Sequence, residues 1–296
     1  MALTHLDRLE AESIAILRET VAVCRRPVMM YSVGKDSSVM LALARKAFAP
    51  GPLPFPLLHI ATGWDFAAVI AHRDAVAAAH GAELIVRSGA ERLNPFTTGI
   101  ERYSRAMLIE PLRAALIEGG YDAAIGGGRR DEEKSRAKER IYSFRGRGGG
   151  WDPRHQRPEP WNLLNGRLHE GESLRVFPLS NWTERDVWDY AAREQVPLVP
   201  LYFAGVRPTI ERDGLLLMVD DPAAVELKPG EAIVERRVRF RTMGCWPLTG
   251  AHESDAVTVE QVVAEVAAAR SSERAGRKVD GQASASMEAK KKEGYF

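Results

Sequence analysis

Apolar residues recur at helical spacing near the start of the chain, and short apolar runs then alternate with further helical patterns. The first pattern predicts an amphipathic helix that includes Leu6, Leu9, Ile16 and Leu17. The later runs predict strands at 28–31, 57–60, 84–86 and 123–125, separated by helices at 37–48, 66–79 and 107–117. Alternating strands and helices are typical of a parallel sheet covered on both faces. We therefore expect an α/β fold in the first half of the chain.

The pattern changes after residue 128. Residues 129–172 are polar, basic and rich in Gly, Pro and Trp without a clear period, and a long irregular segment inside a compact domain is more often functional than not. A strand is predicted at 174–179, and the capping box that begins at Thr183 predicts a helix through Arg193. The remainder is mixed, with expected strands at 215–219 and 238–241 and a helix from Thr258.

Composition narrows the class of protein. The 296 residues carry a net charge of +1, which favours neither a nucleic-acid partner nor a membrane partner. Two cysteines without close spacing do not form a disulfide framework, and the charged N-terminus has no apolar signal core. We therefore expect a cytoplasmic location.

The segment 31–38 joins the first predicted strand of the sheet to the following helix and has the features of a phosphate-binding loop. Unpaired backbone N–H groups at a helix N-terminus bind phosphate, and Gly34 permits close approach. Lys35 adds a charge, and the hydroxyl groups of Ser32, Ser37 and Ser38 add donors. Asp36 beside phosphates predicts either a Mg²⁺ ligand or a brace for the loop. The spacing differs from that of a Walker A loop.

The pattern S-x-G-K-D-S in this loop resembles the pyrophosphate-binding loop of the ATP pyrophosphatase superfamily, whose members cleave ATP between the α- and β-phosphates. Nearly the whole chain is also similar to the small subunit of bacterial two-subunit sulfate adenylyltransferases. The segments that carry this resemblance are 53–59, 126–144, 175–183, 240–250 and 286–296.

The resemblance implies an adenine nucleotide α-hydrolase-like fold, with a nucleotide-binding domain at 1–200 and a mixed C-terminal extension at 201–296. It also implies a reaction, the first step of sulfate assimilation: ATP and sulfate give adenosine 5′-phosphosulfate and pyrophosphate. Mg²⁺ would accompany ATP, and a large GTPase subunit would be the partner. The tail at 286–296 is expected to contribute to that assembly.

The segment 126–140 follows a predicted strand and contains five clustered cations that suit a reaction between two anions. These are Arg129, Arg130, Lys134, Arg136 and Lys138. We expect Arg129 and Arg130, which lie nearest the glycines, to act with Lys35 in catalysis, whereas the later cations can face solvent. The nucleotide is also expected to contact His59, Thr62, Gly63, Gly127 and Lys134.

Two departures from the family pattern remove carboxylates. Ala61 stands where the family usually has Asp, and Val206 stands where it usually has Glu. A paralogue that adenylylates another oxyanion therefore stays open, as does a non-catalytic nucleotide-sensing subunit of a GTPase. A phosphosulfate reductase is disfavoured, because its nucleophilic cysteine would lie on a C-terminal segment and the residues from Ser271 onward contain none.

Overall fold

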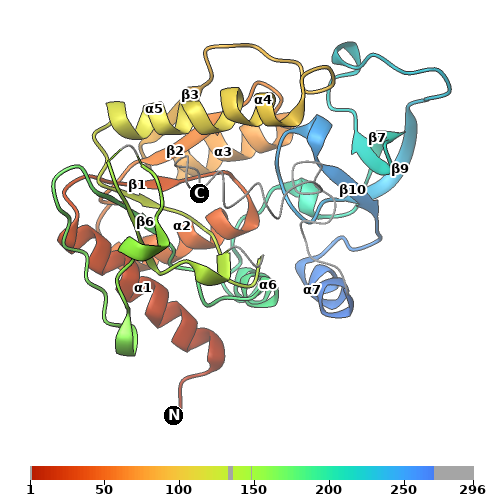
Figure 1. The fold of residues 1–296 in the computed structure, drawn as a ribbon. Coiled ribbons are helices and arrows are strands. Elements are labelled where there is room, and N and C mark those ends of the chain that lie inside the picture. Colours follow the sequence, from red (N-terminus) through yellow and green to blue (C-terminus); the bar gives the residue numbers. More distant parts are fainter. Residues whose placement is uncertain (1, 133–135, 148, 270–296) are drawn as a thin grey trace.

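A computed structural model of the chain describes residues 2–132, 136–147 and 149–269. Its main sheet has six strands in the order β3-β2-β1-β4-β6-β5 (Figure 1). These are β1 (Pro27–Met30), β2 (Leu57–Ala61), β3 (Leu84–Ser88), β4 (Ala123–Ile125), β5 (Tyr142–Arg145) and β6 (Ser173–Val176). Neighbouring strands are parallel except β5 and β6. The predicted α/β class is confirmed.

Helices cover both faces of this sheet. The helices of the described residues are α1 (His5–Val23), α2 (Lys35–Phe48), α3 (Ala67–Ala79), α4 (Ile100–Ser104), the π-helical turn η1 (Arg105–Ile109), α5 (Glu110–Glu118), α6 (Glu184–Arg193) and α7 (Val259–Ala268), of which α7 packs against α6 rather than on the sheet. On one face, Val28 and Leu58 pack against Leu112 of α5, while α1 and α2 lie on the other face (Figure 1). The helix expected at 107–117 is longer than predicted, because α4, η1 and α5 are continuous from Ile100 to Glu118.

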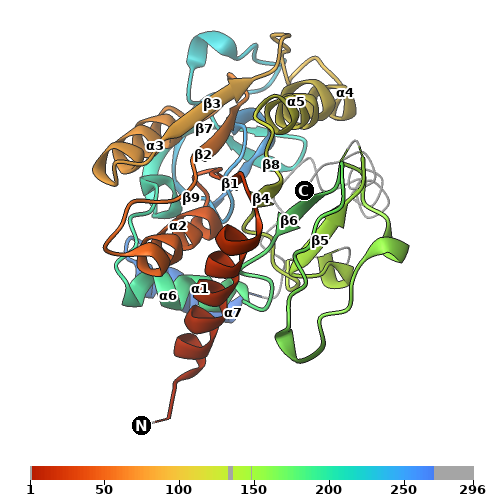
Figure 2. The ribbon, with the colours of Figure 1, turned by 90° about the vertical axis from the view of Figure 1, so that its left-hand side faces the viewer.

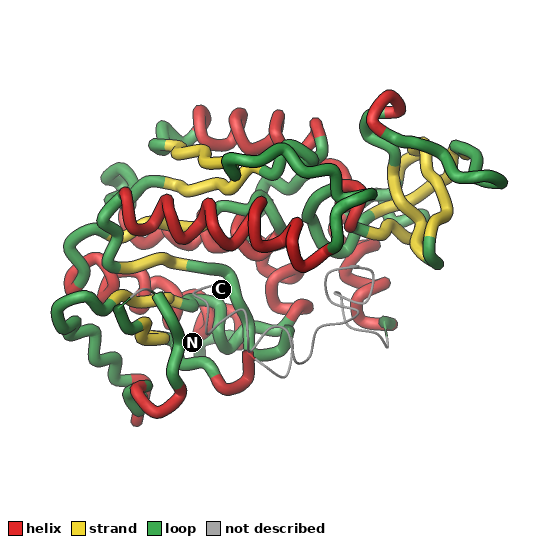
Figure 3. The backbone as a smooth tube through the Cα atoms, turned by 45° about the horizontal axis from the view of Figure 1, so that its top comes forward, coloured by secondary structure: helices red, strands yellow, loops and turns green. Residues whose placement is uncertain are grey.

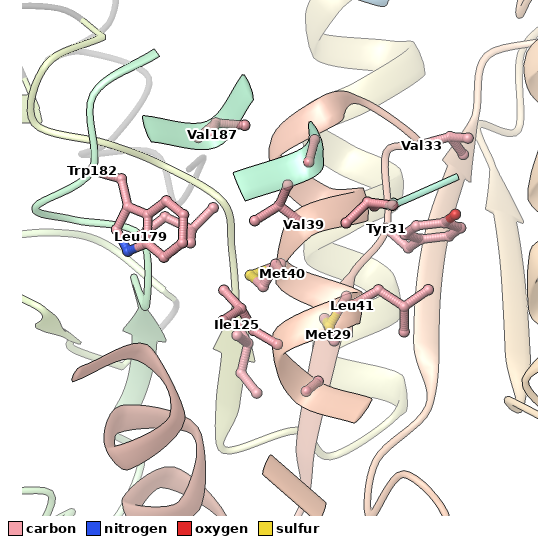
Figure 4. Packing of buried hydrophobic residues seen from close by; sticks show 14 of the residues in the cluster. Met29, Tyr31, Val33, Val39, Met40, Leu41, Ile125, Leu179, Trp182 and Val187 are labelled. Carbon is pink, nitrogen blue, oxygen red and sulfur yellow. The ribbon is translucent and has the colours of Figure 1, made fainter. Parts of the chain in front are cut away.

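The core on the α2 side explains why this helix is fixed against the sheet. Met40 of α2 points toward Ile125 of β4, and both belong to the same buried cluster as Trp182 (Figure 4). The indole Nε1 of Trp182 donates to the hydroxyl of Ser13 (3.0 Å), which in turn donates to a backbone carbonyl at residue 178 (2.8 Å). The buried indole N–H and the Ser13 hydroxyl therefore both have hydrogen-bond partners, and α1 is joined to the loop after β6.

The stretch 129–172 is less irregular than its composition predicts. It contains β5, which pairs with β6 as an antiparallel edge strand, so the prediction was wrong for residues 142–145. The connection from β5 to β6 runs along this edge of the sheet (Figure 2). Its Glu159 carboxylate accepts hydrogen bonds from the backbone N–H groups of Ile141 and Tyr142. This side-chain pairing occupies backbone donors at the start of β5.

The C-terminal part forms a small closed barrel of antiparallel strands in the order β10-β8-β7-β9. The strands are β7 (Gly205–Arg212), β8 (Leu215–Met218), β9 (Val234–Arg239) and β10 (Gly250–Glu253). Asp213 and Gly214 both have positive φ, which matches the two-residue turn that a tight hairpin prefers. The barrel lies at one end of the molecule (Figure 3), and β8 and β9 confirm the predicted strands with shifted bounds.

One segment after the barrel strand β9 returns to the sheet. The backbone N–H of Trp246 donates to the carbonyl of Trp64 (3.0 Å), and Cys245 forms a β-bridge with Asp65. Residues just beyond β2 and residues of the C-terminal part therefore lie side by side. No described helix has the length and apolar character needed to cross a membrane.

Candidate active site

A cavity of about 320 Å³ lies at the carboxyl ends of the parallel strands. It is lined by the loop after β1, the end of β2, the glycines after β4, η1 and α5, and the segment 242–249. The chain proceeds from β1 to β2 and β3 on one side, and β4 lies on the other side of β1. Open α/β sheets bind ligands in the crevice where the strand order reverses. The cavity occupies that crevice.

The loop after β1 has a strained backbone. Val33 is fully buried and has a φ of +64°, a conformation that a β-branched residue adopts only when its surroundings hold it. Its side chain belongs to the main core next to Tyr31 (Figure 4). Gly34 follows, and a Cβ there would lie 3.4 Å from the Ser32 hydroxyl oxygen and 3.6 Å from the Tyr202 hydroxyl oxygen. The core thus fixes the shape of the predicted phosphate loop.

The loop is held by hydrogen bonds within it and by one from a distant part of the chain. The Ser37 hydroxyl donates to the carbonyl of Gly34 (2.9 Å), and the Ser32 hydroxyl lies 3.3 Å from that of Ser37. The backbone N–H of Lys35 donates to the hydroxyl of Tyr202 (2.8 Å), which comes from the short helix before the barrel. Sequence reasoning missed Tyr202, because its contact with the loop spans 167 residues.

Asp36 is shared by two buried cations. Its Oδ2 accepts from Lys35 Nζ at 3.1 Å, and its Oδ1 accepts from Arg129 Nε at 2.7 Å. Burial opposes ionisation of Asp36, but these two cations outweigh it and hold the pKa of the carboxyl well below its usual range. The carboxylate therefore links the start of α2 to the segment after β4. This arrangement matches the brace that we predicted as one of two roles for Asp36.

The glycines after β4 allow close packing against the loop. A Cβ at Gly127 would lie 3.1 Å from Asp36 Cβ, and one at Gly128 would overlap with Arg136 Nη1. A side chain at either position would therefore push against the phosphate loop or against Arg136. Arg136 and Glu132 both line the cavity and form an ion pair (3.0 Å).

Behind Arg136 lies a group of buried charges. Arg145 of β5 is fully buried and donates from Nη2 to Glu139 (3.0 Å), whose other oxygen lies 3.8 Å from Arg136. Arg175 of β6 is also buried. Burial lowers the pKa of Arg145 to about 10, and burial together with the neighbouring charge of Arg145 lowers the pKa of Arg175 to about 9. The group holds three arginines against the two carboxylates Glu132 and Glu139, so it carries one excess positive charge.

The β2 end of the cavity has a different lining. His59, Thr62 and Asp65 lie here with Tyr103 and Cys245. The Asp65 carboxylate accepts from the backbone N–H of Thr62 (2.8 Å) and from its hydroxyl (3.1 Å). The Tyr103 hydroxyl donates to Cys245 Sγ (3.4 Å). Ala61 ends β2 and is not part of the lining, so Asp65 is the carboxylate that follows this strand into the cavity.

Comparisons with known proteins identify the family. The model of the phosphoadenosine phosphosulfate reductase domain family matches residues 26–251. Sulfate adenylyltransferase subunit 2 of Myxococcus xanthus is 61% identical over 99% of this chain and 97% of its own length. The Photorhabdus laumondii subunit 2 is 58% identical over 99% and 98%. The chain belongs to the sulfate adenylyltransferase subunit 2 family.

Among solved structures, a phosphoadenylyl-sulfate reductase from Candida auris covers 68% of this chain, and 92% of that protein is matched. The two are 19% identical, with a TM-score of 0.48. The resemblance stated from the sequence is thus confirmed by the relatives of the subunit 2 family, which match almost the entire chain.

The structure brings most of the predicted site residues of this family member together. The cavity lining includes Ser32, Gly34, Lys35, Asp36, Ser37, His59, Thr62 and Gly127. Ser38 and Gly63 are adjacent to lining residues in the chain but are not part of the lining. Lys134 lies outside the described residues, as do residues 286–296.

The two predicted catalytic arginines have different positions. Arg129 is buried beneath Asp36, whereas Arg130 is partly exposed and bonds to the side chain of Asn181. Neither lines the cavity, so a catalytic role for them stays a prediction. Arg136, to which we gave less weight, does line it. Arg175 was missed, although a charged residue between Leu174 and Val176 in a buried strand is a recognisable signal.

Proposed function

We propose that this chain is the catalytic subunit of a sulfate adenylyltransferase that joins sulfate to the α-phosphate of ATP. A sulfate oxygen would attack the α-phosphorus and form a new P–O bond. The bond from this phosphorus to the oxygen that bridges to the β-phosphate would break, and that oxygen would leave with pyrophosphate. The observation that carries the proposal is the strained phosphate loop facing Gly127 and Arg136 across one crevice, in a chain 61% identical to a named subunit 2.

The loop after β1 would hold the β- and γ-phosphates. Lys35 supplies a positive charge there, and Ser32 and Ser37 can turn their hydroxyl groups from each other to the phosphate oxygens. Because Val33 is already held at positive φ, the loop does not need to reorganise when ATP binds. Pyrophosphate would then leave from groups that already bind it.

Sulfate would approach from the β4 end of the cavity. Arg136 lines that end, and Arg145 and Arg175 lie behind it in a low-dielectric environment. A positive environment lowers the cost of bringing a dianion to an anionic phosphate. The opposite, β2 end would then receive the nucleoside.

Mg²⁺ would enter with the triphosphate. Mg²⁺ in nucleotide sites keeps several waters and takes one or two carboxylates together with phosphate oxygens, and Asp36 has acceptor capacity beyond its two ion pairs. In the described part of the chain no group of three or more His, Cys, Asp and Glu side chains could hold a metal on its own. The residues therefore fit an ion carried by ATP with Asp36 as its protein ligand, where it would offset phosphate charge.

The partner would be a GTPase subunit. The designation subunit 2 of the relatives supports a second subunit, and the resemblance stated from the sequence supports its GTPase character. The phosphate–sulfate anhydride is unusually high in energy, so coupling to a second nucleotide would drive its formation. We expect the isolated chain to make almost no product without that subunit and GTP.

The decisive experiment measures pyrophosphate and adenosine 5′-phosphosulfate together, with the chain, its partner and GTP present. We expect both products in equal amounts, dependent on sulfate. Sulfate should also be compared with selenate and molybdate. Faster turnover with another oxyanion would instead favour a different acceptor. Nucleotide binding without pyrophosphate release under any condition would favour a nucleotide-sensing subunit.

A further inference from the structure

A tyrosine from the second half of the chain is hydrogen-bonded to the backbone of the phosphate loop. Tyr202 ends the short helix η5 (Pro200–Tyr202), lines the cavity and is 1% exposed. Its hydroxyl accepts the backbone N–H of Lys35, the first residue of α2, at 2.8 Å. The first N–H groups of a helix have no acceptor within the helix, so this hydroxyl supplies one from outside. The position of Tyr202 therefore affects where Lys35 lies.

The short helix η5 is in turn held by a guanidinium group from the barrel. Arg207 of β7 donates from Nη2 to the carbonyls of Pro200 (3.1 Å) and Phe203 (3.0 Å), which lie at the two ends of η5. Its Nη1 donates to the carbonyls of Gly205 (3.3 Å) on β7 and Val238 on β9. One side chain thus joins η5 to two strands of the barrel.

The hydrogen bonds of Arg207 fix relative positions but do not neutralise its charge. Backbone carbonyls accept all four of them, and burial lowers the pKa of this half-buried guanidinium. Moving a charge partly out of water is costly, so a carboxylate would be the expected partner if stability alone were at stake. The planar fork of arginine instead reaches two segments at once in a fixed geometry.

A second contact between η5 and the C-terminal part does not involve Arg207. The backbone N–H of Phe240, just after β9, donates to the carbonyl of Leu201 (3.0 Å). The ring of Tyr202 also packs edge-on against Trp188 of α6, with 5.4 Å between the ring centres. A substitution of Arg207 should therefore leave η5 attached to the fold and change only how precisely the tyrosine hydroxyl is placed.

We propose that Arg207 is a positioning residue for the phosphate loop and acts through η5 and the hydroxyl of Tyr202. This inference rests on the proposed function, in which the loop holds the β- and γ-phosphates of ATP. Arg207 does not line the cavity, so it acts on the site only through other groups. The barrel at one end of the molecule (Figure 3) would then contribute to phosphate binding without touching the nucleotide.

The experiment measures equilibrium binding of ATP and AMP to the full-length chain by calorimetry, without sulfate. AMP lacks the two phosphates that the loop would hold. Tyr202→Phe removes the hydroxyl and keeps the ring, and Arg207→Lys keeps the charge but loses the planar fork. A double variant combines the two substitutions. Arg237→Lys is the matched control, because Arg237 of β9 pairs with Asp255 (2.9 Å) and not with η5.

We expect Tyr202→Phe and Arg207→Lys each to weaken ATP binding by about three- to tenfold, the effect of losing one buried hydrogen bond, and to leave AMP binding unchanged. The double variant should bind ATP no more weakly than Tyr202→Phe alone, because both substitutions act through the same hydroxyl. Arg237→Lys should keep the wild-type affinities. Thermal unfolding of each variant checks that the fold persists.

Three results would overturn the inference. If the losses in the double variant simply added, Arg207 would not act through Tyr202. An equal loss of ATP and AMP affinity in Arg207→Lys would mean a general loosening of the fold. Wild-type ATP affinity in Arg207→Lys would exclude a positioning role, while the proposed function would stand. If the wild-type chain bound no nucleotide at all, the proposed function would fail as well.

Discussion

Buried ion pairs are built differently in two regions: the carboxyl edge of the main sheet, where β1 and β4 end, and the barrel. At the sheet edge, Asp36 is shared by Lys35 and Arg129, which belong to segments that follow two neighbouring strands. In the barrel, Glu231 receives two bonds from the single side chain of Arg212, at 2.8 and 2.5 Å. Arg212 is buried like the sheet-edge cations; its pair joins β7 to the loop before β9, and its guanidinium also lies 4.9 Å from the centre of the Phe96 ring.

The difference separates a contact that shapes a site from one that stabilises a fold. Removing one member of a two-membered pair leaves an uncompensated charge and destabilises the fold. A carboxylate shared between two segments sets the position of both cations at once, and small displacements of catalytic groups are costly. We therefore expect substitutions at the sheet edge to reduce nucleotide use, and substitutions of the barrel pair to reduce stability.

Lys35→Ala should give the largest effect. Loss of this charge at the β- and γ-phosphates should lower sulfate-dependent turnover by about 100-fold or more, because charge stabilisation in a buried site is a major catalytic contribution. Pyrophosphate release with the partner and GTP is the measurement. Lys46→Ala on the same helix α2 is the control, since Lys46 pairs with Glu10 and Glu194 away from the cavity. Equal effects of the two substitutions would remove the phosphate loop from the mechanism.

Asp36→Asn should give the next largest effect. It removes the negative charge that holds Lys35 and Arg129, so we expect ATP binding to weaken by about tenfold. Titrating Mg²⁺ separates the two roles of Asp36. A metal ligand requires a higher Mg²⁺ concentration for half-maximal activity in the variant, whereas a brace alone leaves that concentration unchanged. If Asp36→Asn bound ATP with the affinity of the wild-type chain, the proposed distinction between the two regions would be wrong.

The phosphate loop could be predicted from the sequence because its features are local. A buried strand, a glycine and a helix start lie within ten residues, and each has a short-range signal. The alternation of strands and helices likewise follows from side-chain periodicity. The class of the sheet and most of its strands were therefore confirmed.

Features that depend on distant pairing could not be predicted. Closure of the barrel and the pairing of β5 need partners elsewhere in the chain. Arg130 and Arg136 both follow the glycines, but Asn181 holds Arg130 away from the cavity, while Glu132 and Glu139 hold Arg136 at it. No local pattern distinguishes the two arginines, so proximity to the glycines did not predict which of them lines the cavity.

Glu231→Gln tests the effect that we expect in the barrel. The neutral amide leaves the buried guanidinium of Arg212 without its charged partner, so the variant should unfold at a lower temperature or denaturant concentration. ATP affinity should be unchanged, because neither residue of the pair lines the cavity. Asp36→Asn, measured in the same two assays, is the matched variant. A loss of ATP affinity in Glu231→Gln as large as that in Asp36→Asn would show that the barrel pair also shapes the site.

The smallest effect should appear as a change in pH dependence. His252 of β10 is partly exposed and lies next to Arg239, and its partial burial together with this charge lowers its pKa to about 4, although Glu265 opposes the shift. Arg241 adds a smaller repulsion. The ordinary histidine pKa is about 6.5 in an unfolded chain. Between these values the unfolded chain binds a proton that the folded chain does not, so stability falls as the pH decreases from about 6.5 toward 4.

His252→Gln should remove part of this acid sensitivity. The denaturant midpoint of the wild-type chain should drop more between pH 7 and pH 5 than that of the variant, while ATP affinity at pH 7 stays equal in both. Because burial also lowers the pKa of His59, a His59→Gln variant should lose part of the acid sensitivity too. One histidine would then report on the barrel and the other on the site. Identical pH profiles for the wild-type chain and His252→Gln would show that the barrel histidine takes up its proton equally in the folded and unfolded states.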